Sequence, residues 1–144
     1  MTVLGLDVGN KRIGVAVSDE SRLLATPNTT IIRTELSKDI DSILEVISQK
    51  LVKEIVVGFP LSLSGKVGIQ ARNVSLFIDS LSSYTSIPIK TVDERYSTVE
   101  AEKRLKEIGV NPSENRSRVD ALAAAIILQS YLDSDSQFTP SYRC

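Results

Sequence analysis

The sequence contains no histidine, and its single cysteine, Cys144, is the last residue. Without an imidazole, neither a Ser-His-Asp triad nor a Cys-His pair can form, so nucleophilic catalysis of these kinds is excluded. Zinc held by histidine and cysteine is excluded as well, and one cysteine cannot make an intrachain disulfide. If the chain is an enzyme, its chemistry depends on Asp, Glu, Lys, Tyr or the main chain. A divalent metal held by oxygen ligands becomes the leading candidate by elimination.

The sequence also has no long apolar run, since none approaches the ~18 residues of a membrane span. The first ten residues contain an acid and two glycines where a signal peptide would carry its apolar region. We therefore expect a cytoplasmic protein. With 42% hydrophobic and 24% charged residues, the 144-residue chain is typical of one soluble globular domain. We place that domain at residues 1–132 and expect residues 133–144 to form a polar, frayed tail.

An excess of positive charge is absent too. The chain has 17 Lys and Arg residues against 18 Asp and Glu, which gives a formal net charge of −1. No basic stripe of the kind that marks a general polyanion binder is present. A role in nucleic-acid chemistry therefore requires that the positive charge be concentrated locally.

Hydrophobic periodicity divides the chain into short strands and amphipathic helices. We predict strands at residues 3–8, 13–18, 29–33, 54–59 and 87–92, and helices over residues 40–51, 74–81, 97–108 and 118–132. The third strand is expected to begin after a break at Pro27 and Asn28. Ser37 is the expected cap of the first helix, and Gly109 is the expected C-terminal glycine of the third.

The order of these elements is β-β-β-α-β-α-β-α-α. The short turn between the first two strands predicts a hairpin, and strands separated by helices return parallel through right-handed crossovers. The expected fold is an α/β domain of the ribonuclease-H-like kind, with a mixed five-stranded sheet flanked by helices.

Three acids stand at or near the ends of predicted elements: Asp7, Glu94 and Asp120. Each has an ordinary explanation, because Asp7 can close a turn and Glu94 can belong to a solvated strand end. Asp120 can form an N-terminal box with Ser117 in the first turn of the last helix. In the predicted topology, however, the first strand is central, the fifth lies near it, and the last helix begins close to their ends. The three carboxylates can therefore converge at one place.

Converging carboxylates repel one another and raise each other's pKa unless a cation separates them. With Mg²⁺ or Mn²⁺ they become the oxygen ligands of a two-metal site, in which ions about 3.5–4 Å apart support in-line attack of water on a phosphodiester. Such a site needs no histidine, which agrees with the composition.

Four segments of the chain carry a family resemblance: LGLDVGNKRIGVAVSD, IVVGFPLSLSGKVGIQA, VDERYSTVEAE and SRVDALAAAIILQSYLD. In this order they resemble the YqgF/RuvX family of Holliday-junction resolvase-like proteins, which are also assigned to maturation of the 5′ end of pre-16S ribosomal RNA. The resemblance extends over residues 3–132 and implies a ribonuclease-H-like nuclease with Asp7, Glu94 and Asp120 as its acidic triad. The chain departs from the family at Asn10, where threonine is usual, and at Ser64, where an acid is usual.

Further residues are candidates for contact with nucleic acid or for shaping the site. The candidates for phosphate contact are Lys11, Arg12, Arg95 and Arg118, with Arg116 the least favoured. Gly9 would let the backbone come close to a phosphate or metal, and the resemblance places the loop with Gly58 and Gly65 beside the site. As exposed cations and turn glycines, all of these residues also have purely structural explanations.

Three functions remain open at this point. The first is a metal-dependent nuclease acting on structured RNA, with pre-16S ribosomal RNA favoured, or on branched DNA such as a Holliday junction. The second is an actin-like or sugar-kinase ATP-binding domain, although such proteins clasp nucleotide between two domains and 144 residues make only one. The third is a nucleic-acid-binding or ribosome-assembly module with little catalysis.

Overall fold

The computed structural model of the chain describes residues 1–60, 68–93 and 97–143, and for residues 135–143 it describes the backbone only. Its strands are β1 (Thr2–Val8), β2 (Arg12–Ser18), β3 (Ala25–Ile32), β4 (Val52–Phe59) and β5 (Ile89–Asp93). Its helices are α1 (Leu36–Lys50), α2 (Ile69–Ser82), α3 (Ser97–Glu107) and α4 (Arg116–Arg143), with a short 3-10 helix at Pro112–Glu114. The predicted order of strands and α-helices is confirmed.

One mixed sheet contains the described strands in the order β3-β2-β1-β4-β5. β1 pairs antiparallel with β2, and β2 with β3, as the predicted hairpin requires. β1 pairs parallel with β4, and β4 with β5, since a helix precedes each of the two later strands. β1 is therefore the central strand, and the expected α/β fold with a mixed five-stranded sheet is confirmed.

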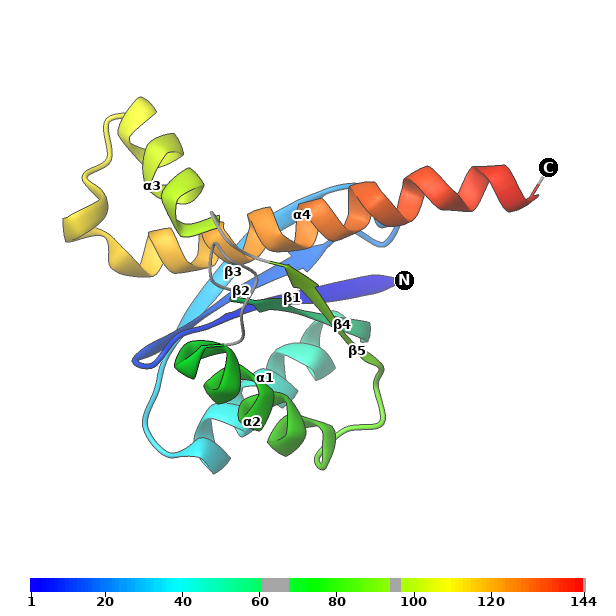
Figure 1. The fold of residues 1–144 in the computed structure, drawn as a ribbon, viewed down its shortest axis with the longest axis horizontal. Helices are drawn as coiled ribbons and strands as arrows, with labels where there is room; N and C mark the ends of the chain where they lie inside the picture. The colour runs from blue at the N-terminus through cyan, green and yellow to red at the C-terminus, as the bar shows by residue number, and fades with distance from the viewer. Residues whose placement is uncertain (61–67, 94–96, 144) are drawn as a thin grey trace.

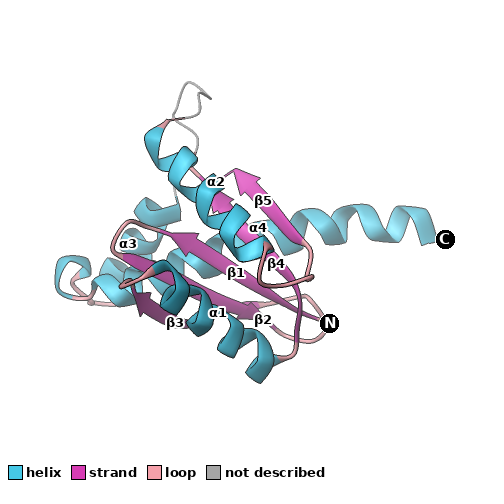
Figure 2. Ribbon diagram, turned by 90° about the horizontal axis from the view of Figure 1, so that it is seen from below, coloured by secondary structure: helices cyan, strands magenta, loops and turns pink. Residues whose placement is uncertain are grey.

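Helices cover both faces of this sheet. Figures 1 and 2 show α1 and α2 on one face and α4 across the other, and α3 packs against α4. Successive strand residues point to opposite faces, so Leu4 and Leu6 of β1 are buried with α1 and α2, whereas Val3 is buried under α4. By the same alternation, Gly5 and Asp7 of β1 face α4.

Glycines let α4 lie close to the central strands. A Cβ atom on Gly5 would lie 2.7 Å from the Cβ of Leu128, and one on Gly14 would collide with the main-chain carbonyl oxygen of Asp120. Gly14 stands on β2 directly opposite Asp7 of β1. The lack of a side chain at Gly14 therefore allows the first turns of α4 to reach the end of the central strand.

The strand β3 is longer than the sequence predicts. It begins at Ala25 and continues through Pro27, where a break was the expectation. Pro27 lies opposite Ala16, next to an irregularity in the register between Val15 and Ala16. Proline is tolerated here because β3 is an edge strand with one row of N–H groups outside the ladder, and because a bulge relieves the local pairing.

The start of α1 also differs from the prediction. The helix begins at Leu36, and its N-terminal residue carries no side-chain cap, so the expected cap by Ser37 is wrong. The buried carboxylate of Asp39 instead accepts the main-chain N–H of Thr34 at 3.0 Å. This bond fixes the chain that enters α1, but it does not cap the N–H groups of the first turn.

The ends of α3 and α4 give one agreement and one difference. Gly109, with a φ of 82°, follows α3 in the left-handed conformation expected of a C-terminal glycine. α4 is longer than predicted, because the backbone of residues 133–143 continues the helix. The domain boundary drawn at residue 132 stays a prediction. No described helix combines the length and the apolar character that a membrane span requires.

Candidate active site

A cavity of about 330 Å³ opens where β1 and β4 reach their carboxyl ends. In an open α/β sheet this edge is the usual position of a binding site. The lining comes from these two strands, the turn after β1 and the parts of the chain around the starts of α2, α3 and α4: Asp7, Val8, Gly9, Gly58, Pro60, Gln70, Thr98, Arg116 and Asp120. We call it the carboxylate cavity.

Two of the three predicted acids, Asp7 and Asp120, meet in the carboxylate cavity. Asp7 is on the face of β1 that looks toward α4, with Gly14 opposite it on the neighbouring strand. Because Gly14 has no side chain, the main chain of Asp120 rests directly over it. Close packing of α4 on the sheet thus brings together two acids that are distant in the sequence.

Arg12 makes an ion pair with Asp120 through its Nε and the carboxylate Oδ2. The Arg12 side chain is 31% exposed and that of Asp120 is 16% exposed, so the pair is partly shielded from solvent. A guanidinium on one carboxylate reduces the repulsion between two acids that share a cavity. Arg12 therefore compensates part of the negative charge of the site.

The alternative explanation of Asp120, as a first-turn acid of the last helix, is wrong. α4 begins at Arg116 and has no acid in its first turn, which places Asp120 in the second turn. Its carboxylate accepts a hydrogen bond from the Arg12 guanidinium rather than from N–H groups at the start of the helix. Arg116 lines the carboxylate cavity and pairs with Glu102 of α3 at 3.1 Å.

The turn between β1 and β2 is held in place by main-chain and side-chain hydrogen bonds. Gly9 donates its N–H to the carbonyl of Arg12 at 2.9 Å, and a Cβ on Gly9 would lie 2.8 Å from that oxygen. Arg33 donates from Nη1 to the carbonyl of Gly9 at 2.9 Å and from Nε to Asp39 at 3.1 Å. The absence of a side chain at Gly9 therefore lets the turn close on the carbonyl of Arg12.

Two residues that support this edge of the sheet were not predicted from the sequence. The guanidinium of Arg33 lies 5.3 Å from the centre of the Phe77 ring, so it joins the turn to α2 as well as to α1. Gln70 donates to the carbonyl of Val8 at 3.1 Å. No local motif marks such residues, because their partners are remote in the chain. Gly14 did carry a signal, since a glycine inside a strand often marks a close approach of backbone.

The other predicted site residues fall into three groups. Gly9 and Gly58 line the carboxylate cavity, and Lys11 is exposed in the turn beside Gly9. Arg118 instead lines a second cavity, next to the first turns of α4. Three predicted residues lie outside the described part of the chain: Gly65, Glu94 and Arg95.

The oxygen donors of the carboxylate cavity suit a hard divalent cation. Asp7 and Asp120 offer carboxylate oxygens, the ligands that Mg²⁺ and Mn²⁺ prefer. Among the residues that the structure describes, no three acidic, cysteine or histidine side chains are grouped closely enough to hold a metal. The two acids thus leave coordination positions for water, for substrate or for a further residue.

The sheet topology is that of a ribonuclease-H-like domain, and solved structures share this fold. A structure of Thermus thermophilus RuvC aligns with a TM-score of 0.60 at 16% identity, covering 95% of this chain and 97% of that one. The fowlpox virus Holliday junction resolvase aligns with a TM-score of 0.53 at 14% identity, covering 93% and 99%. The fold is therefore that of the RuvC-like resolvases.

The chain belongs to the RuvX family, which is described as Holliday junction resolvase and whose model matches residues 1–134. A relative from Roseiflexus sp. (strain RS-1) is 46% identical over 132 residues, which are 92% of this chain and 94% of the relative. A relative from Syntrophus aciditrophicus (strain SB) is 46% identical over 137 residues, 95% and 91% of the two chains. Both are named "Putative pre-16S rRNA nuclease". The resemblance seen in the four motifs is confirmed. The chain is therefore an enzyme of the nuclease class.

Proposed function

We propose that the chain is a metal-dependent nuclease that processes the 5′ end of pre-16S ribosomal RNA. The observation that carries this proposal is the meeting of Asp7 and Asp120 in one cavity at the carboxyl end of the central strand. The substrate is taken from the name of the relatives, which align with more than nine tenths of this chain.

Asp7 and Asp120 would hold Mg²⁺ or Mn²⁺, with Glu94 as the third ligand. Glu94 directly follows Asp93, the last residue of β5. Asp93 pairs with Phe59 on β4, the residue after Gly58 of the carboxylate cavity. When bound, two such ions support attack of water on a phosphodiester and stabilise the leaving oxygen.

The cations around the cavity suit a phosphodiester substrate. Arg12 and Arg116 are each oriented by one carboxylate partner. A guanidinium has five N–H donors, so either side chain can bind a phosphate oxygen while its ion pair persists. Because the net charge of the chain is −1, a nucleic-acid enzyme of this sequence needs positive charge concentrated near its site. Arg12 and Arg116, together with the exposed Lys11, supply that charge.

A Holliday junction is the second candidate substrate. The family is described as Holliday junction resolvase, and the fold aligns with Thermus thermophilus RuvC in complex with Holliday junction substrate at a TM-score of 0.59. With 15% identity, that likeness concerns the fold alone. The same paired acids would serve either substrate, because both are phosphodiesters.

A cleavage assay tests the proposal. A 5′-extended 16S precursor RNA and a four-way DNA junction are each incubated with the protein in Mg²⁺ and in Mn²⁺. The wild type should shorten the RNA at its 5′ end, and Asp7→Asn should lose this activity while keeping the circular dichroism spectrum of the fold. Asp41→Asn is the matched control, because Asp41 is exposed on α1, and it should cleave like the wild type.

Each other result has a distinct meaning. Full activity of Asp7→Asn would refute the assignment of the site. Cleavage of the junction alone would replace RNA by branched DNA as the substrate. Binding of the precursor with no cleavage in either metal would favour an assembly factor with little catalysis.

A further inference from the structure

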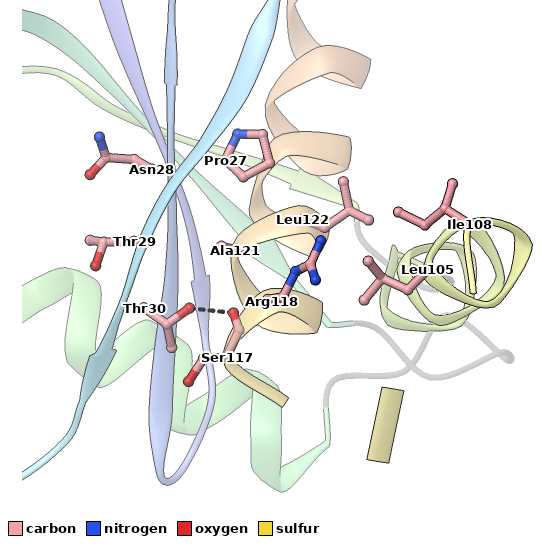
Figure 3. A pocket seen from close by; sticks show the side chains of 10 residues that line it. All are labelled: Pro27, Asn28, Thr29, Thr30, Leu105, Ile108, Ser117, Arg118, Ala121 and Leu122. Carbon is pink, nitrogen blue, oxygen red and sulfur yellow. Dashed lines mark hydrogen bonds between the residues drawn. The ribbon is translucent and has the colours of Figure 1, made fainter. Parts of the chain in front are cut away.

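A second cavity, of about 490 Å³, lies between the edge strand β3, α3 and the first turns of α4 (Figure 3). Its walls are mostly apolar, with Pro27 on β3, Leu105 and Ile108 on the side of α3, and Ala121 and Leu122 on α4. We call it the apolar cavity. Its volume lies within the range of about 300–1,000 Å³ that is usual for small-ligand sites.

The walls of the apolar cavity are held together by packing and by a hydrogen bond. Leu105 of α3 is 4% exposed and belongs to a small core that it shares with α4. On the other side, the Thr30 hydroxyl donates to the carbonyl of Ser117 at 2.6 Å, which ties β3 to the start of α4 (Figure 3). The hollow is therefore a preformed feature of the domain.

Among the described residues that line the apolar cavity, Arg118 is the charged one. Figure 3 shows the side chain extending from α4 toward Leu105 and Ile108. Within the described residues, Arg118 makes no ion pair, whereas Arg12 and Arg116 each pair with a carboxylate. An exposed guanidinium without a partner, beside an apolar hollow, complements a ligand that joins an anion to an apolar group.

The start of α4 places the two cavities next to each other. Asp120 lines the carboxylate cavity, and the adjacent residue Ala121 lines the apolar cavity together with Arg118. Residues one or two positions apart on a helix point in different directions. A nucleic-acid strand bound at Asp120 therefore has only to pass this turn of helix to reach Arg118.

We propose that the apolar cavity binds one unpaired nucleotide of the substrate RNA, with its base between Leu122 and the Leu105–Ile108 wall and its phosphate on Arg118. The proposal rests on the proposed nuclease function. A base has apolar faces and its phosphate is anionic, so an unpaired nucleotide supplies both groups that the cavity complements. An apolar peptide segment would leave Arg118 without an anion, and a base stacked inside a duplex cannot enter.

Fluorescence anisotropy in the Asp7→Asn background measures RNA binding apart from cleavage. The probe is a fluorescein-labelled RNA hairpin with a single-stranded 5′ extension, together with a series in which each extension nucleotide in turn is abasic. One abasic position should weaken binding about tenfold, the loss expected when one held base is removed. The remaining positions should change the affinity by less than about twofold, since only one base occupies the cavity.

Three substitutions in the same background locate the contact. Arg118→Gln should weaken binding about tenfold and reduce the slope of log K against log salt by about 0.7, the value for one phosphate on a single strand. Ile108→Asp, at a position that is 68% exposed, should abolish the effect of the sensitive abasic position. Lys50→Gln, an exposed cation at the end of α1, is the charge-matched control and should leave both readouts unchanged.

Three results would overturn the proposal. In the first, Arg118→Gln binds the RNA with the same affinity and the same salt slope as the Asp7→Asn protein that carries no further substitution. Another is an abasic series without a sensitive position. The third is a dimer, seen by sedimentation equilibrium, that Ile108→Asp dissociates, because a second copy of the chain would then fill the cavity. None of these results depends on cleavage, so the nuclease function stands or fails separately.

Discussion

Replacing Gly14 by alanine tests the packing that brings the two acids together. The new Cβ would collide with the carbonyl oxygen of Asp120 and would lie 3.1 Å from the main-chain nitrogen of Ala121. Neither atom belongs to a flexible side chain, so α4 has to move away from β2. Overpacking of this kind costs about 1–3 kcal/mol. Because the obstacle is main chain, we expect a loss of about 2–3 kcal/mol in the free energy of unfolding.

Urea unfolding followed by circular dichroism measures this loss. With an m-value of about 2 kcal/mol/M, a loss of about 2 kcal/mol lowers the urea midpoint by about 1 M. Gly68→Ala is the comparison, because a Cβ on Gly68 meets no atom of the described residues within 4 Å. Its free energy of unfolding should fall by only about 0.5–1 kcal/mol, because Gly68 is the N-cap residue of α2, where glycine is preferred to alanine.

Gly5→Ala separates the effect on stability from the effect on the site. Its Cβ would lie 2.7 Å from the Cβ of Leu128, about two helical turns beyond Asp120. Gly5→Ala should lower the midpoint and keep cleavage, whereas Gly14→Ala should lower both because it displaces Asp120. A Gly14→Ala protein with the wild-type midpoint would show that α4 does not rest on Gly14.

Three further substitutions test contacts elsewhere. Glu54, whose side chain is 8% exposed, lies between two cations at 3.2 and 3.3 Å, so Glu54→Gln should lower the free energy of unfolding by about 1–2 kcal/mol in a urea titration. Arg33→Lys should lose the hydrogen bond to the Gly9 carbonyl. It should reduce the cleavage rate clearly and change the melting temperature only slightly. Two main-chain N–H groups hold the pKa of Asp19 below its usual 3.8. Its stabilisation is therefore complete above that pH and is lost as the pH falls through the lower folded-state pKa, so Asp19→Asn should flatten the acid limb of a pH–stability curve.

Each of these expectations has a contradicting result. A Glu54→Gln protein as stable as the wild type would mean that the two cations contribute nothing there. Equal cleavage by Arg33→Lys would show that the turn keeps its position without the guanidinium. An acid limb that is as steep in Asp19→Asn as in the wild type would assign that pH dependence to other carboxylates.

The periodicity of the chain was sufficient to predict the sheet, but it did not predict the bounds of β3 or the end of α4. Pro27 predicts the end of a strand when only its neighbours are considered. The sequence does not reveal that its strand lies at the edge of the sheet, where proline is tolerated. The cap of α1 was misplaced for a similar reason. Ser37 has the preferred chemistry, yet the helix begins before it, at Leu36, and the N-cap residue Glu35 makes no side-chain cap.

Asp7 and Asp120 could be predicted as partners from topology, because both stand where elements meet at one edge of the sheet. That both line one cavity depends on Gly14, whose importance becomes visible only once α4 is placed over it. The cations were harder to predict. Arg116 and Arg118 are two positions apart, and on a helix such residues point to different sides. The structure places Arg116, the least favoured candidate, in the carboxylate cavity and Arg118 in the apolar cavity.

We propose that Asp7 and Asp120 jointly bind a divalent cation in the carboxylate cavity. Isothermal titration of Mn²⁺ into the wild type, Asp7→Asn, Asp120→Asn and the surface control Asp41→Asn tests it most directly. We expect the wild type and Asp41→Asn to bind Mn²⁺ alike and each site variant to lose at least about tenfold in affinity, because a carboxylate ligand is removed. Equal Mn²⁺ affinity in all four proteins would contradict it.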